Sequence, residues 1–164
     1  MPDLDKIYLF RMSHIDNISH IWAYGNTKMD SANANNDYKS IGDASLISTR
    51  SNFIIPNGNV LGQYIPFYFF FRMPMLYVIQ KGYNQVNSVE AEDIVYCVVP
   101  VSYVINNQID YLFTDGHATN YFSNFYEPKD ILKIKGLLDF KAIEDSYWKD
   151  DVDLDKKEEK KLSF

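Results

Sequence analysis

The run Tyr-Ile-Pro-Phe-Tyr-Phe-Phe-Phe at residues 64–71 constrains the fold more than any other stretch of this chain. It is apolar and mostly aromatic, so folding has to cover it with other elements. The run is far too short to span a bilayer. It therefore predicts a buried strand, with Pro66 near the start, where a missing backbone N–H is tolerated best.

The composition bounds what can surround this run. A chain of 164 residues, 46% of them apolar, has the size of one domain with a substantial core. The net charge is −6, from 16 Lys and Arg against 22 Asp and Glu, so any contact with nucleic acid has to be local. The 13 Tyr, 11 Phe and 2 Trp can stack unpaired bases, but most of them should fill the core.

Several classes of protein are disfavoured. Cys97 is the only cysteine, which excludes an internal disulfide framework and a Cys-rich zinc site and suits the reducing cytoplasm. The first residues show no signal or transit peptide. Phosphate-loop, dinucleotide-loop, nucleophile-elbow and zinc-protease motifs do not occur. His14 and His20 lie six residues apart, on different faces of a helix, and His117 is remote, so no metal site is expected.

Local signals in the N-terminal part predict a helix followed by a long loop. Ser13 is the expected N-cap, Asp16 reaches back to it as in a capping box, and Gly25 ends the helix. Residues 27–43 are rich in Asn, Asp and Ser, which predicts a surface loop. Two interpretations of this loop are equally supported: a lid that orders on ligand binding, or a disordered insertion.

The rest of the chain predicts further helices, strands and turns. The expected elements are a turn at residues 57–59, a helix over 75–81 between Pro74 and Gly82, strands over 94–99 and 111–113, a turn at 114–117, a helix over 137–148, and a charged, solvated segment over 150–161.

Four separated strings of this sequence resemble the DarT family. They are Ile7-Tyr8 with Arg11-Met12-Ser13-His14-Ile15-Asp16-Asn17, Ile65-Pro66-Phe67-Tyr68-Phe69 with Arg72-Met73-Pro74-Met75-Leu76-Tyr77, Phe113-Thr114-Asp115-Gly116-His117, and Tyr147-Trp148. The strings follow the family's order at its approximate spacing. The resemblance therefore covers nearly the whole chain.

The resemblance implies both a fold and an activity. The fold would be an α+β ADP-ribosyltransferase fold, two small packed β-sheets with flanking helices, in one domain over residues 1–164. The activity would be that of a toxin that takes ADP-ribose from its co-substrate NAD and attaches it to thymine or guanine in single-stranded DNA. A macrodomain antitoxin of the DarG kind would be its partner, and no membrane is implied.

The resemblance also assigns roles by matching position. Arg11, Met12 and Ser13 would line the nicotinamide end of NAD, and Asn17 and His20 would face NAD from the helix that follows. For Ser13 a helix cap is an equally good and compatible interpretation. For His20 a plain surface histidine is the safer one.

Three further residues carry expectations. Arg50, six residues before Pro56, matches the family's catalytic arginine, whose guanidinium can hold phosphate and stabilise charge on the base. His117 matches a histidine near the DNA and NAD cleft, or it is a turn residue that bonds its own loop. Arg72 matches an arginine expected at the DNA, although Phe70-Phe71 stand where a Cys-Pro-like or proline-containing pair is common.

The family's catalytic glutamate is expected in a Lys-Ala-Glu-Phe or Gln-Ala-Glu-Phe string. A carboxylate there stabilises the cationic ribose as the bond to nicotinamide breaks. Here Leu162-Ser163-Phe164 follow a pair of lysines, so Ser163 stands in the glutamate's place and carries no charge. We expect impaired catalysis, unless Glu158 or Glu159 substitutes, and a fold that is incomplete at its C-terminus.

Three origins of this serine are open. A one-base deletion explains it, because restoring one A to AAA AAG CTG AGT TTC gives AAA AAA GCT GAG TTT, which encodes Lys-Lys-Ala-Glu-Phe. A deliberate truncation and a natural pseudoenzyme are the others. The main functional alternative is an inactive relative that binds single-stranded DNA, NAD or the antitoxin. A weaker one is a transferase acting on tRNA or protein.

Overall fold

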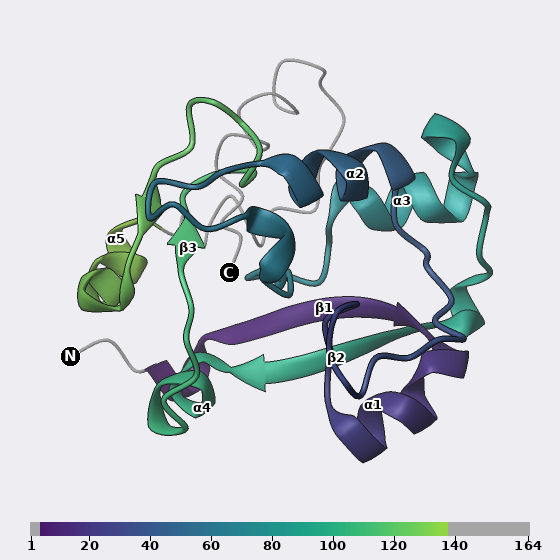
Figure 1. Cartoon of the computed structure of the whole chain (residues 1–164), viewed down its shortest axis with the longest axis horizontal. Coiled ribbons are helices and arrows are strands. Elements are labelled where there is room, and N and C mark those ends of the chain that lie inside the picture. Colours follow the sequence, from purple (N-terminus) through teal and green to yellow (C-terminus); the bar gives the residue numbers. More distant parts are fainter. Residues whose placement is uncertain (1–3, 138–164) are drawn as a thin grey trace. The chain divides into compact units, whose positions relative to one another are not determined.

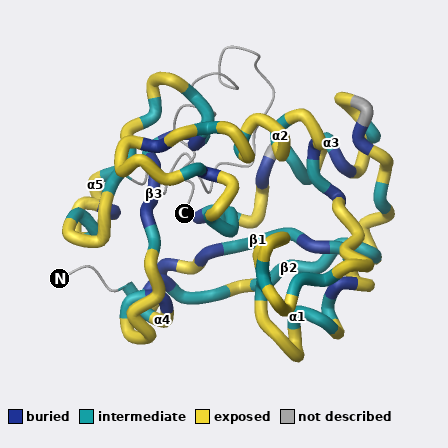
Figure 2. The backbone as a smooth tube through the Cα atoms, in the orientation of Figure 1, coloured by how far each residue is buried: buried dark blue, intermediate teal, exposed yellow. Residues whose placement is uncertain are grey.

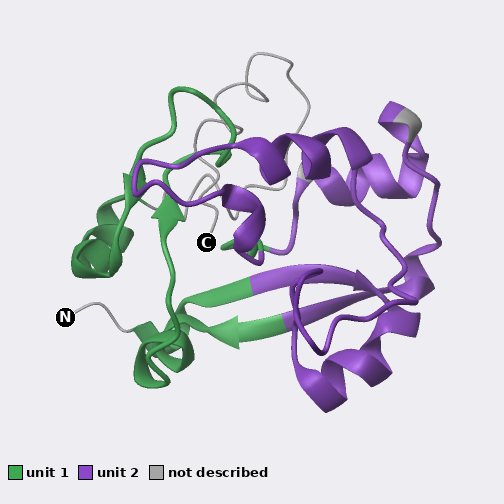
Figure 3. Cartoon of the chain, viewed as in Figure 1, with its two compact units in different colours: residues 1–9, 66–70, 98–164 green, residues 10–65, 71–97 purple. Residues whose placement is uncertain are grey.

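A computed structural model of the chain describes residues 4–137 (Figure 1). These residues fall into two compact units, each built from separate stretches of sequence (Figure 3). Unit 1 comprises residues 1–9, 66–70 and 98–164, and unit 2 comprises residues 10–65 and 71–97. The prediction of one domain over residues 1–164 stays a prediction.

Two small sheets form the strands of the structure. Strand β1 (Tyr8–His14) pairs with β2 (Ile94–Pro100), and β3 (Phe113–Thr114) pairs antiparallel with β4 (Phe125–Tyr126) (Figure 1). The strand expected at residues 94–99 is therefore confirmed, although most of its residues are only half-buried. The strand expected at 111–113 is confined to its last residue and Thr114, with Phe113 opposite Tyr126.

Unit 1 has a core around β3, where the chain is buried in Figure 2. Phe113 is fully buried and stacks on Tyr126, with ring centroids 5.1 Å apart. The helical elements of this unit are η1 (Leu4–Lys6), α4 (Val101–Asn106), η6 (Pro128–Lys133) and α5 (Ile134–Leu137). The buried members of the core are Ile7, Leu9, Phe69, Val101, Val104, Phe113 and Ile134.

Unit 2 contains a smaller core formed by Ile41, Ile79 and Val86. Met12 of β1 packs against it, as does Ile94 of β2. The helical elements of this unit are η2 (Ile15–Asn17), α1 (Ile18–Tyr24), α2 (Ala44–Asn52), η3 (Leu61–Gln63), α3 (Pro74–Lys81), η4 (Tyr83–Gln85) and η5 (Ala91–Asp93). One residue of the long polar loop, Ile41, is thus part of the core.

The prediction of a strand over residues 64–71 is wrong. Only Tyr68 makes a β-bridge, and the run divides between the two units, with residues 66–70 in unit 1. Only Phe69 is buried, and Phe71 is exposed. A strand needs a partner for its backbone, and Pro66 has no N–H to give one.

The helix signals near the N-terminus were partly correct. Gly25 ends α1 with φ 75°, as expected. Ser13, however, lies in β1, and the N-cap is His14, whose Nδ1 accepts from the N–H of Asp16 at 3.1 Å. Asp16 does not reach back to Ser13 but pairs with Lys39. An imidazole nitrogen one residue later therefore does what the serine hydroxyl was expected to do.

The helix expected over residues 75–81 is confirmed as α3. Pro74 occupies its first turn, where a missing N–H is no loss. Gly82 follows in the left-handed conformation, with φ 65°. The turn at residues 57–59 is also confirmed, because the N–H of Ile55 donates to Asn59 at 2.9 Å and Ile54 pairs with Val60.

Asp43 caps helix α2, and its carboxylate should contribute stability that depends on pH. Its Oδ1 accepts from the Ser45 hydroxyl at 2.6 Å and from the N–H groups of Ser45 and Leu46 at 2.8 and 3.3 Å. These bonds, the Ser45 hydroxyl first, hold the pKa of Asp43 below its ordinary 3.8. A lowered pKa in the folded state means that the stabilisation is complete above that ordinary value and is lost as pH falls through the lowered one.

Replacing Asp43 by alanine should therefore lower the free energy of unfolding by about 1 kcal/mol at neutral pH. Urea titrations at about pH 7 and about pH 3 measure this difference, which should shrink at the lower pH. Asp37→Ala, an exposed residue of the preceding loop, is the control. An equal loss at both pH values would contradict the role of the carboxylate charge.

Two expected elements, the rest of the helix at 137–148 and the charged segment at 150–161, lie outside the described residues. No helix within residues 4–137 is long and apolar enough to cross a membrane.

Candidate functional site

The end of β1 brings three of the expected site residues to the polar loop. Arg11, half-buried, donates from Nη2 to the hydroxyl of Tyr38 at 3.4 Å. Met12 packs on the core that includes Ile41. Ser13 has no exposed surface, so its hydroxyl faces the interior of unit 2. Of the residues expected at the nicotinamide end of NAD, Arg11 thus binds the loop at Tyr38 and Met12 packs on the cluster that contains Ile41.

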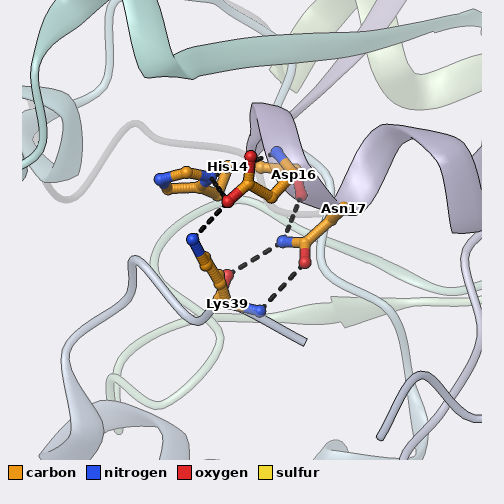
Figure 4. A network of polar contacts seen from close by, with 5 residues as sticks. His14, Asp16, Asn17 and Lys39 are labelled. Atoms are coloured by element: carbon orange, nitrogen blue, oxygen red, sulfur yellow. Dashed lines mark hydrogen bonds and ion pairs between the residues drawn. The ribbon is translucent and has the colours of Figure 1, made fainter. Parts of the chain in front are cut away.

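Asn17 fastens the loop to the start of the helix (Figure 4). Its side chain is 1% exposed. Its Nδ2 donates to the main-chain oxygen of Lys39 at 2.8 Å and to the Ser13 hydroxyl at 3.1 Å, while its Oδ1 accepts from the Lys39 N–H at 2.9 Å. One carboxamide therefore satisfies both main-chain groups of a residue 22 positions away.

A surface ion pair lies over this anchor. Lys39 Nζ pairs with Asp16 Oδ2, and the same carboxylate oxygen lies 3.7 Å from Nδ1 of His14 (Figure 4). The hydrogen bond between Lys39 and Asp16 lowers the pKa of Asp16 and raises the pKa of Lys39. Both groups are exposed, so solvent screens the pair, and the buried Asn17 contributes more to holding the loop.

The rest of the loop is organised by local turns. N–H groups of Ser31 and Ala34 donate to carbonyls three residues back, at 3.1 and 3.0 Å, and the Asn35 side chain accepts from the N–H of Asp37 at 3.0 Å. No helix or strand occurs in residues 26–43, so the predicted surface loop is confirmed. Its role as a lid stays a prediction.

Replacing Asn17 by alanine should lower the free energy of unfolding by about 2 kcal/mol, because the N–H and carbonyl of Lys39 lose their partner. For a chain of this size the melting temperature should fall by about 4–8 °C. Asn33→Ala, an exposed asparagine of the same loop, should change the free energy by less than about 0.5 kcal/mol. Equal melting temperatures for the two variants would show that Asn17 is no anchor.

Arg50 is held at the end of α2 by a turn. Its Nη2 donates to the carbonyls of Leu61 and Tyr64 at 3.3 and 3.1 Å. Gly62 allows this close approach, since a Cβ there would lie 2.9 Å from the Cα of Ser51. The guanidinium of the expected catalytic arginine is therefore fixed in position by two elements of unit 2.

His20 and His117 occupy different settings. The ring of His20 lies 4.9 Å from that of Tyr24, one turn later on α1. His117, in unit 1, bonds its own loop: its carbonyl accepts from the Ser123 hydroxyl at 2.8 Å, and its Nδ1 lies 2.9 Å from the Thr119 hydroxyl. The N–H of Thr119 lies 3.4 Å from the same nitrogen.

Arg72 lies beside an aromatic group that the sequence did not reveal. Its Cζ is 5.6 Å from the centroid of the Phe71 ring. Phe10 and Tyr96 belong to the same group, because the Phe10 ring lies 6.1 Å from that of Phe71 and 6.4 Å from that of Tyr96. These pairs are distant in sequence, so no local pattern could have indicated them.

The expected site residues are divided between the two units, and their roles stay predictions. Unit 2 holds Arg11, Met12, Ser13, Asn17, His20, Arg50 and Arg72, whereas His117 belongs to unit 1. Ser163 lies outside the described residues. Within residues 4–137 no group of three or more His, Cys, Asp or Glu side chains could hold a metal ion.

Comparisons with known proteins agree on one family. The family described as "ssDNA thymidine ADP-ribosyltransferase, DarT" matches residues 10–163. A DNA ADP-ribosyl transferase of Thermus sp. (strain 2.9) is 30% identical over 158 residues, which are 95% of this chain and 72% of that protein. A fusion of a DNA ADP-ribosyl transferase and a DNA ADP-ribosyl glycohydrolase from Thermosipho africanus is 27% identical over 146 residues, covering 87% of this chain and 35% of the fusion.

Solved structures of the Thermus sp. 2.9 protein share the fold. Its complex with ADP-ribosylated single-stranded DNA superposes with a TM-score of 0.78 at 30% identity, covering 96% of this chain and 73% of that one. Its complex with NAD+ gives 0.73 at 27% identity, covering 99% and 75%. The predicted class, an α+β ADP-ribosyltransferase fold, is thereby confirmed. The chain belongs to the DarT family of DNA ADP-ribosyltransferases, enzymes that use NAD.

Proposed function

We propose that this chain transfers ADP-ribose from NAD to thymidine in single-stranded DNA, at a rate that Ser163 keeps low. The observation that carries the proposal is the likeness, at a TM-score of 0.78, to a relative bound to ADP-ribosylated single-stranded DNA. The family description, which names thymidine, supports that base over guanine. Action in the cytoplasm, where such DNA is accessible, is part of the proposal.

NAD supplies ADP-ribose, with nicotinamide as the leaving group. Two guanidiniums of unit 2, those of Arg11 and Arg50, carry the charge that a diphosphate requires. Both are held by neighbouring groups, Arg11 by Tyr38 and Arg50 by two carbonyls. Met12, Ser13, Asn17 and His20 complete the proposed NAD site, with Asn17 acting through the segment at Lys39.

His117 and Arg72 are each proposed to contact the acceptor DNA. An imidazole can donate a hydrogen bond to a base or to a ribose hydroxyl, which is the role proposed for His117. A hydrogen bond aimed at the reacting groups helps the base attack as the bond to nicotinamide breaks. Arg72 carries the positive charge that a DNA phosphate requires.

Ser163 limits the proposed reaction. The positive charge that develops on the ribose calls for a carboxylate, and a hydroxyl has no charge to offer it. The family match runs from residue 10 to residue 163 and so includes this serine. The same serine favours a second function, in which the chain binds NAD and single-stranded DNA, or an antitoxin, without transfer.

We also propose a partner. The Thermosipho relative joins a DNA ADP-ribosyl transferase to a DNA ADP-ribosyl glycohydrolase in one protein. An antitoxin of that kind, which removes ADP-ribose from DNA, is the expected partner of this chain. The pairing makes the chain the toxin of a toxin–antitoxin system.

The test of the proposed function is a base panel. The chain is incubated with NAD and each of four single-stranded oligonucleotides that lack one of the four bases, and adducts are sought by mass spectrometry. Slow modification of every oligonucleotide except the one without thymidine is expected. Binding of NAD and DNA with no adduct would select the second function, and labelling of the protein alone would overturn both.

A further inference from the structure

Phe71 and Arg72 form an exposed surface with two flat groups. The Phe71 residue is 42% exposed, and the Arg72 guanidinium lies over its ring, with Cζ 5.6 Å from the centroid. Arg72 is itself exposed. An aromatic ring attracts a guanidinium in this position, and both surfaces can stack on an unpaired base.

The surface is supported from behind. The hydroxyl of Tyr96 donates to the carbonyl of Phe71 at 2.7 Å, and burial raises the pKa of Tyr96, which keeps this donor protonated. The Phe10 ring lies 6.1 Å from Phe71 and meets Tyr96 edge to face. Residues from β1, β2 and the segment before α3 thus hold Phe71 in place, and all of them belong to unit 2.

Neither residue is explained by the core of the unit. Phe71 is not among the buried residues of unit 2, and it does not belong to the cluster of Ile41, Ile79 and Val86. Among residues 4–137 no carboxylate forms an ion pair with Arg72. A cation beside an exposed ring, with no acidic neighbour bound to it, suits an anionic ligand that also has a flat face.

We propose that Phe71 and Arg72 bind one unpaired nucleotide of single-stranded DNA other than the modified one. The base stacks on the ring and guanidinium, and the guanidinium edge donates to the adjacent phosphate. This inference rests on the proposed function and adds a subsite to it. Phe71 stands where the resemblance leads us to expect a Cys-Pro-like or proline-containing pair, so the subsite gives this chain its own preference for the base bound there.

The first test is the affinity for a fluorescent single-stranded oligonucleotide, measured by anisotropy without NAD. Phe71→Leu keeps the apolar contact with Phe10 and removes the aromatic face, so affinity should fall about 5- to 100-fold. Tyr103→Leu removes another exposed aromatic ring, on α4, and this variant should bind the oligonucleotide with the affinity of the unchanged chain. Duplex DNA, whose bases are already stacked, should bind both variants equally.

The second test measures the phosphate contact. Arg72→Gln should reduce the slope of log affinity against log salt concentration by about 0.7, because one counterion release is lost. An abasic site moved along the oligonucleotide should identify one position at which the unchanged chain loses affinity and Phe71→Leu loses nothing further.

The outcomes separate the two proposals. Unchanged affinity in both variants, with the unchanged chain binding single-stranded DNA, would overturn the subsite and leave the proposed function standing. A loss that is equal for duplex and single-stranded DNA would also overturn the subsite. Absence of any DNA binding by the unchanged chain would overturn both proposals.

Discussion

Replacing Leu162 and Ser163 by alanine and glutamate should accelerate the release of nicotinamide from NAD about 10²- to 10³-fold in the presence of single-stranded DNA. The factor is that of adding one preorganised group that stabilises the charge of a transition state. The change restores the Lys-Ala-Glu-Phe string that the family resemblance leads us to expect. Single-turnover chromatography of nicotinamide, with enzyme in excess over NAD, measures the rate of this step.

The matched control is Leu162→Ala/Ser163→Gln, which has the shape of the glutamate variant and no charge. It should react as slowly as the unchanged chain, because only a carboxylate opposes the positive charge on the ribose. Glu158→Gln and Glu159→Gln, each made in the unchanged chain, should not alter its rate of nicotinamide release. Acceleration by the glutamine variant, or loss of activity on removing Glu158 or Glu159, would contradict the assignment of residue 163.

Replacing Arg50 by glutamine should weaken NAD binding about 10- to 150-fold. A hydrogen bond to a charged group contributes about 1.5–3 kcal/mol, and glutamine cannot supply the charge that a diphosphate needs. Arg50→Lys keeps the positive charge but lacks the planar guanidinium, so its affinity for NAD should lie between those of the unchanged chain and Arg50→Gln. Isothermal titration calorimetry with NAD measures all three proteins.

The structural bonds of Arg50 require a separate control. Glutamine also removes donors from the carbonyls of Leu61 and Tyr64, so the melting temperature should fall as well. Lys81→Gln removes an exposed positive charge at the end of α3 and should leave NAD binding unchanged. A variant of Arg50 that melts lower but binds NAD as before would make this arginine a structural residue only.

Short-range signals predicted short-range structure well. Pro74 and Gly82 gave both ends of α3, since the limits they impose on the backbone depend on one residue each. The prediction of a strand at residues 64–71 is wrong because a strand depends on residues far away in the sequence. An apolar run indicates burial but not the backbone partner that makes a strand, and this run divides between two units.

In the candidate site, too, the sequence indicates some residues but not the distant residues that bind them. The family resemblance indicates Arg11 and Asn17, but not their partners Tyr38 and Lys39, which lie more than 20 positions away in the sequence. A polar loop carries no periodic pattern that would reveal such partners. The apolar run likewise predicts a buried strand that includes Phe71. The contact between Phe71 and Arg72 is seen only in the structure.

The most direct test of the account is mass spectrometry of a thymidine-containing single-stranded oligonucleotide after incubation with NAD and either the unchanged chain or Leu162→Ala/Ser163→Glu. Both proteins should bind NAD, and ADP-ribose should be attached to thymidine slowly by the first and rapidly by the second. Equal rates would contradict the role given to Ser163. Absence of an adduct with both proteins, while NAD still binds, would contradict the proposed transfer to DNA.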